Sequence, residues 1–163
     1  MVIVLFIFST HGQTQNSILT REQNNKWLDS LKTLNLDQQL LTISERLLAD
    51  TNVFVRQFYN DRIKVDEQVG NRVYGDGKPT LIVGGSPMII DNKTAPNKIV
   101  GLTRYLATEF IKEINILSPN DPATTAIYGS PGLSGIIVMT LTKKKYLKKF
   151  RKLKLQSNGY RYT

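Results

Sequence analysis

The sequence predicts an α+β fold in which a small mixed β-sheet is combined with short helices. Three observations support this prediction: an apolar stripe of helical period at 36–49, an apolar strand followed by a glycine turn at 79–90, and a strand, short helix and strand over 111–142. Segments that each bury one side pack as layers around a single core. A chain of 163 residues has room for one such domain.

Residues 36–49 carry the clearest helical pattern. Leu36, Leu40, Ile43 and Leu47 recur at the spacing of one helix face, and Asn35 stands where an N-cap residue is expected. The apolar residues at 53–55 and 58–59 that follow fit either a strand or a second helix.

The middle of the chain predicts a hairpin, a helix and a strand. Pro79 introduces a strand over 80–83, glycines and a proline at 84–87 form a turn, and 88–90 return as the second arm. An amphipathic helix is expected over 99–107, with Leu102 and Leu106 on one face. The alternating residues 111–117 then predict a further strand.

A capped short helix and the strongest strand pattern come next. Asp121 can accept hydrogen bonds from free backbone N–H groups, and Pro122 is tolerated in a first helical turn, so a helix should run over 122–128 and end at Gly129. The apolar run 136–142 predicts the closing strand of the domain.

The N-terminus resembles an export signal. Residues 2–8 are consecutively apolar, which suits the core of a signal peptide and falls short of the roughly 20 residues of a membrane-spanning helix. We therefore expect a signal peptide at 1–12, a flexible polar leader at 13–34 and an exported protein. A buried N-terminal strand is the alternative.

The excess positive charge lies in a basic tail at 143–163, which holds nine Lys or Arg and no acidic residue. Residues 1–142 contain 13 basic and 13 acidic residues and are neutral. Tyr146, Phe150 and Leu153 share one face of a possible helix. Such a cationic helix could lie on an anionic membrane surface, dock on an acidic partner or simply add solubility; nucleic acid is not expected as a partner of an exported protein.

The residues needed for common catalytic chemistry are missing. The chain has no cysteine, and its single histidine, His11, lies in the predicted signal peptide. Residues 75–80 lack the first glycine of a phosphate loop and carry Pro79 at its Ser/Thr position. Ser130 and Ser134 have no histidine to act as base. The sequence predicts a non-enzymatic protein without a cofactor or metal ion.

Two segments resemble the plug domain of TonB-dependent outer-membrane transporters. The run ATTAIYGSPGLSGIIVMT at 123–140 is similar to the end of that domain, where a short helix ending in Tyr-Gly-Ser leads through a glycine-rich turn into a closing strand. The run PTLIVGGSPMI at 79–89 resembles its second landmark, a strand, a glycine-containing turn and a proline-aliphatic step, with Gly84 where aspartate is common. The resemblance implies a plug-like fold over 35–142.

The resemblance also implies a function and partners. No barrel sequence follows the plug-like segment, so we expect a large outer-membrane β-barrel supplied by another chain. A separate plug resembles the plug protein of the type 9 secretion system translocon, where a periplasmic protein associated with the outer membrane closes the pore, possibly beside accessory translocon subunits. The alternative is a free periplasmic binding or signalling module with the same fold.

We expect partner contacts in two loops and in the basic tail, whose lysines could enter an acidic barrel lumen. These residues are Gly84, Gly85, Ser86 and Pro87 in the first loop, Tyr128, Gly129, Ser130, Pro131, Gly132 and Gly135 in the second, and Lys144, Lys145, Lys148, Lys149 and Lys152 in the tail.

Overall fold

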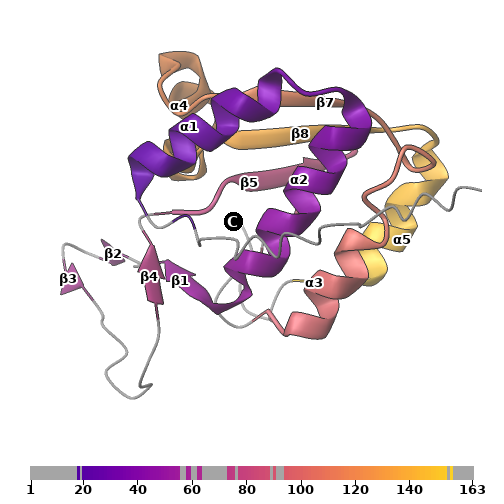
Figure 1. The fold of residues 1–163 in the computed structure, drawn as a ribbon, viewed down its shortest axis with the longest axis horizontal. Helices are drawn as coiled ribbons and strands as arrows, with labels where there is room; N and C mark the ends of the chain where they lie inside the picture. Colours follow the sequence, from indigo (N-terminus) through magenta and orange to yellow (C-terminus); the bar gives the residue numbers. More distant parts are fainter. Residues whose placement is uncertain are drawn as a thin grey trace, which may run out of the picture.

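The computed structural model describes residues 18, 20–55, 58–59, 62–63, 73–75, 77–88, 90, 94–153 and 155; the predicted signal peptide at 1–12 lies outside them. The predicted α+β fold is confirmed (Figure 1). The helices are α1 (Arg21–Lys32), α2 (Leu36–Ala49), α3 (Pro96–Thr103), α4 (Pro122–Tyr128) and α5 (Leu147–Lys152), with 3-10 turns η1 (Asp50–Asn52), η2 (Ser130–Ser134) and η3 (Lys144–Tyr146).

A four-stranded mixed sheet forms the centre of the fold. Its strands are β5 (Thr80–Val83), β6 (Ser86–Met88), β7 (Ile111–Leu117) and β8 (Ile136–Leu141), in the order β6-β5-β8-β7. Strand β5 pairs in parallel with β8, and the other two pairings are antiparallel. Pro87 lies in the edge strand β6, where the missing N–H costs no internal ladder bond.

Two small two-stranded sheets lie beside the main one. Strand β1 (Val53–Val55) pairs in parallel with β4 (Val73–Gly75), and β2 (Phe58–Tyr59) pairs antiparallel with β3 (Arg62–Ile63). The choice between helix and strand at 53–55 and 58–59 is therefore settled in favour of strands.

Helices α1 and α2 lie across the main sheet (Figure 1). Leu28 and Leu31 of α1 are buried in one hydrophobic cluster with apolar residues of α2, β5 and β8. From β8, Ile137 and Met139 are both fully buried in this cluster. The core thus lies between the helices and one face of the sheet.

The two helix starts predicted from capping residues are confirmed. Asn35 Oδ1 accepts a hydrogen bond of 3.0 Å from the Gln38 N–H at the start of α2. Asp121 Oδ1 accepts one of 2.9 Å from the Ala123 N–H at the start of α4. Each bond satisfies a backbone donor that has no partner inside its helix, which fixes where the helix begins.

Two element boundaries differ from the prediction. Helix α3 runs from Pro96 to Thr103, so it begins and ends earlier than the expected 99–107. Its start is explained by Pro96, because proline suits the first turn of a helix. Leu102 and Leu106 are both buried, although only Leu102 is helical. The returning hairpin arm is 86–88 instead of 88–90, since the two glycines alone make the turn.

The polar leader expected at 13–34 is wrong for residues 21–32, which form α1. Thr20 and Gln23 make a capping box at its start. Leu28 and Leu31 are fully buried. Leu28 and Leu31 are three positions apart on one face of α1. Because the residues around them are mostly polar, this short apolar stripe was not recognised in the sequence.

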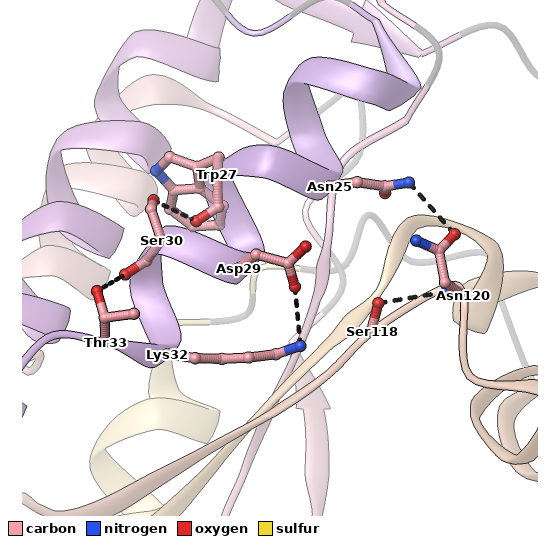
Figure 2. Close-up of polar contacts among 8 residues, drawn as sticks. All are labelled: Asn25, Trp27, Asp29, Ser30, Lys32, Thr33, Ser118 and Asn120. Carbon is pink, nitrogen blue, oxygen red and sulfur yellow. Dashed lines mark hydrogen bonds and ion pairs between the residues drawn. The ribbon is translucent and has the colours of Figure 1, made fainter.

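Polar contacts tie α1 to the loop between β7 and α4 (Figure 2). Asn25 Nδ2 donates a hydrogen bond to Asn120 Oδ1 at 3.5 Å, and Asn120 N donates to Ser118 Oγ at 3.3 Å. Asn24 Nδ2 donates to the backbone oxygen of Ser134, at 2.9 Å, in the glycine-rich segment. Helix α1 therefore packs on the segment that carries the family resemblance.

The basic tail is also partly built into the domain. Phe150 of α5 is 1% exposed and Leu155 is buried, and both belong to the main hydrophobic cluster. Tyr146 and Leu153, on the predicted apolar face, pack against the same cluster. The domain boundaries expected at 35 and 142 are thus too narrow, because the core takes side chains from both flanking segments.

Gly135 is required by its backbone angle and by a close contact. Its φ is +83°, and a Cβ atom there would lie 2.5 Å from Leu28 Cδ1 and 3.3 Å from the Leu117 backbone oxygen. Gly129 has a φ of +63° but open space around it. A side chain at Gly129 would therefore meet backbone strain alone, whereas one at Gly135 would meet backbone strain and steric conflict.

Gly135→Ala should destabilise the fold more than Gly129→Ala. Both substitutions carry a strained backbone that costs about 1–3 kcal/mol, and only the former also pushes Leu28 away, which adds about 1–3 kcal/mol. Urea denaturation followed by Trp27 fluorescence measures both losses. Equal losses would show that α1 does not pack against this turn.

Candidate functional site

The first predicted contact loop is the turn between β5 and β6. Gly84 and Gly85 have φ of +54° and +79°, as a two-residue hairpin turn requires. Ser86 Oγ accepts a hydrogen bond of 2.9 Å from Arg151 Nη2 of α5. A Cβ on Gly84 would lie 3.5 Å from Leu147 Cδ1. The turn and the start of the basic tail are therefore neighbours.

The second predicted loop divides into exposed and buried parts. Gly129 is exposed and Tyr128 is half-buried, while Ser130 and Pro131 lie in the turn η2. Gly132 and Gly135 are buried, which is a correction to their predicted role, since buried glycines pack the fold and do not contact a partner. A Cβ on Gly132 would lie 2.8 Å from the backbone oxygen of Thr124 in α4.

The predicted lysines of the tail form an exposed cationic surface. Lys144, Lys145, Lys148, Lys149 and Lys152 are all exposed on η3 and α5. Lys149 Nζ lies 4.6 Å from the ring centroid of Phe110 and 5.4 Å from that of Tyr146, which is the range of cation–π contacts. The rings of Phe110 and Tyr146 therefore favour one position of the Lys149 ammonium group.

A cleft of about 510 Å³ lies among α1, α2, α4 and the strands β5, β6 and β8. Gly85, Pro87 and Tyr128, from both predicted loops, contribute to its lining. Most of the other lining residues are apolar, and they include Ile43, Leu47, Leu81, Met88, Ile90, Ile127, Ile136 and Ile137.

A buried ion pair lies in the wall of this cleft. Arg46 Nε is 2.5 Å from Asp50 Oδ2, and the two side chains are 5% and 6% exposed. Lys78 Nζ donates a hydrogen bond of 2.6 Å to the backbone oxygen of Asp50. The guanidinium carbon of Arg46 lies 5.1 Å from the ring centroid of Trp27. The cationic side chains of Arg46 and Lys78 and the carboxylate of Asp50 thus lie together in the wall of the mostly apolar cleft.

The buried Arg46–Asp50 ion pair is only partly hydrogen-bonded. Arg46 Nη1 and Nη2 and Asp50 Oδ1 are buried and have no hydrogen-bond partner among the described residues. Burial raises the pKa of the Asp50 carboxyl, while the charges of Arg46 and Lys78 act in the opposite direction. Buried polar atoms without hydrogen bonds are costly, so this ion pair is less stabilising than a fully bonded one.

Sequence reasoning missed this cleft. Arg46 lies on the apolar stripe of α2, between Ile43 and Leu47. A charged residue on a core-facing stripe is unusual, and it was the signal in the sequence that pointed to this cleft. Within the described segments, no three or more His, Cys, Asp or Glu side chains gather as metal ligands. The cleft thus combines a mostly apolar lining with one buried ion pair in its wall.

No family model, curated protein or solved structure matches this chain. Among the residues that the structure describes, no helix has the length and apolar character needed to cross a membrane.

Arg46→Met should destabilise the protein strongly, by about 3–5 kcal/mol, because it leaves the buried Asp50 carboxylate without its cation. The double variant Arg46→Met/Asp50→Leu should recover much of that loss, since it removes both charges of the buried pair and leaves neither without the other. Chemical denaturation at neutral pH measures both. A double variant less stable than the single one would contradict this account of the pair.

Asp50 should also make stability depend on pH. A carboxyl whose pKa is raised by folding stabilises the fold most below its unfolded pKa, and that contribution is lost as pH rises through the folded pKa. The free energy of unfolding of the wild type relative to Asp50→Asn should therefore fall from below pH 3.8 towards neutral pH. Denaturation of both proteins across this range measures the difference. A difference that rises with pH would mean that Arg46 outweighs burial.

Proposed function

We propose that this protein is a non-enzymatic plug that occupies and gates the pore of a separate large outer-membrane barrel, in the first instance a type 9 protein secretion translocon. The proposal places the protein in the periplasm, in contact with the outer membrane. Its partners are the barrel and, beside it, accessory translocon subunits.

The pairing of the two plug-like segments is the observation that carries this proposal. The strand–turn–strand at 79–89 and the helix–turn–strand at 123–140 lie far apart in the sequence. In the fold they are joined by the parallel ladder of β5 and β8, with Leu81 opposite Ile137 and Val83 opposite Met139. Their direct pairing brings the two plug-like segments together as one unit, which supports a common plug-like origin.

The position of the positive charge supports docking in an acidic lumen. The exposed lysines of η3 and α5 lie beside the β5–β6 turn, to which Arg151 is hydrogen-bonded through Ser86. The apolar side of α5 is taken up by the core through Phe150. An interfacial helix binds a bilayer through such an apolar face, so the outer face of α5 suits an acidic protein surface better than lipid.

The size of the domain is compatible with this role. A compact chain of 163 residues has a radius of gyration of about 15 Å. Barrels of about 16–18 strands leave an open aqueous channel, and wider ones need a plug in the lumen. Polar contacts between such a plug and the wall permit both closure and release.

Charge reversal of the tail tests the proposal. The triple variant Lys144→Glu, Lys148→Glu and Lys152→Glu should recover about tenfold less of a large barrel than the wild type, because attraction to an acidic lumen becomes repulsion. The measurement is a pull-down of the tagged full chain from detergent-solubilised outer membranes at low salt.

The matched control reverses three exposed lysines away from the tail, Lys26, Lys32 and Lys112, and should recover the barrel normally. Deletion of the protein should also make the outer membrane permeable to large hydrophilic solutes, and the wild type should restore the barrier. Wild-type pull-downs without a large barrel would contradict the plug.

The cleft favours a second candidate, a free periplasmic binding or signalling module with the plug-like fold. A plug needs only an outer surface, whereas a cleft of about 510 Å³ is within the range of small-molecule sites. The same pull-down distinguishes the two, since a binding module recovers a soluble partner or none.

A further inference from the structure

Lys149 of the basic tail lies against three aromatic rings at once. Its Nζ is 4.6 Å from the ring centroid of Phe110, 5.4 Å from that of Tyr146 and 5.8 Å from that of Tyr105. All three distances are within the range of cation–π attraction. These three rings, which we call the aromatic seat, thus act together on one ammonium group.

The aromatic seat is a fixed part of the fold. The ring of Phe110 meets those of Tyr105 and Tyr146 edge to face, with centroids 5.5 Å and 5.0 Å apart. Phe110 is buried, and the ring of Tyr105 also contacts that of fully buried Phe150, with centroids 5.5 Å apart. Edge-to-face pairs are attractive, so each ring holds its neighbours in place. The ammonium group therefore rests on rings that do not have to move.

The aromatic seat lowers the cost of using Lys149 in a contact. A free lysine side chain loses conformational freedom when it pairs with a carboxylate, and this loss offsets much of the gain from an exposed ion pair. Contacts with the rings already restrict Lys149 in the unbound protein, so less freedom is left to lose on binding. Lys149 is nevertheless exposed, so a partner can reach it. Its charge is thus preorganised for an anion.

The surroundings of Lys149 favour an acidic protein segment as the partner. Lys145, Lys148 and Lys152 are exposed within four residues of it, and the basic tail contains no acidic residue. Such a group of cations attracts a segment that carries several carboxylates. The apolar side of α5 is packed in the core through Phe150, so it is not free to enter a lipid bilayer.

We propose that Lys149 is the central contact of the cationic surface and pairs with a carboxylate of an acidic protein segment, while the surrounding lysines attract this segment from a distance. This role rests on the proposed function, docking in an acidic lumen, and identifies the side chain that matters most for it. Well-ordered central contacts carry most of the binding energy of an interface, whereas charges at its rim mainly change the association rate.

Removal of single charges from the full chain tests this proposal, with labelled polyglutamate as the acidic probe. Lys149→Gln should weaken binding at low salt about tenfold, because a preorganised central contact is lost. Lys148→Gln is the matched control, since Lys148 is exposed and has no cation–π contact among the described residues. It removes the same charge and should weaken binding only about twofold. Equal losses in the two variants overturn the proposal.

Removal of a ring without a change in charge tests the aromatic seat itself. Tyr146→Leu keeps an apolar side chain at a half-buried position and should weaken polyglutamate binding about threefold, because the Lys149 ammonium group is less restricted. Lys149→Arg should stay within about twofold of the wild type, since a guanidinium also stacks on aromatic rings. Wild-type affinity in a folded Tyr146→Leu variant overturns the role of the seat; if this variant does not fold, the lysine variants decide.

The barrel pull-down separates a failure at Lys149 from a failure of the plug. If the wild type recovers the barrel and Lys149→Gln and Lys148→Gln reduce recovery equally, the central role of Lys149 is overturned and the plug stands. If the wild type recovers no barrel, the plug is overturned and polyglutamate binding decides on Lys149. Binding to vesicles of phosphatidylglycerol and phosphatidylcholine, without binding to polyglutamate, overturns the choice of an acidic protein as the partner.

Discussion

The parallel pairing of β5 with β8 is the contact on which the rest of this structure depends. Parallel strands need a long crossover, and here the chain between them supplies α3, β7 and α4. The pairing makes β8 a central strand, with β7 on one side and β5 on the other. Fully buried Ile137 and Met139 then provide the surface on which α1 and α2 pack. Without this ladder neither the core nor the cleft would form.

The same pairing places two distinct surfaces on either side of one hairpin turn. On one side, Ser86 and Gly84 contact α5 and lead to the exposed lysines. On the other, Gly85 and Pro87 line the apolar cleft. A short turn thus lies between an electrostatic surface suited to a macromolecule and a cavity suited to a small ligand.

The ion pair of Arg46 and Asp50 stands out against an otherwise apolar core. Burial of such a pair is often no more stabilising than apolar residues of similar volume. Within the part of the chain that the structure describes, both guanidinium Nη atoms and one carboxylate oxygen of the pair also lack hydrogen-bond partners. Stability alone therefore does not account for it.

The fold class and the elements with local markers could be predicted from the sequence alone: α2 through Asn35, α4 through Asp121 and the strands β5 and β8 through their apolar runs. Capping and periodicity act over a few neighbouring residues, so they can be read without knowledge of the fold. In contrast, the burial of α1 in the core and the position of Arg46 at the cleft became visible only in the folded chain. Burial depends on side chains from distant segments, and a polar helix such as α1 becomes a core element only when a glycine such as Gly135 leaves space for its leucine.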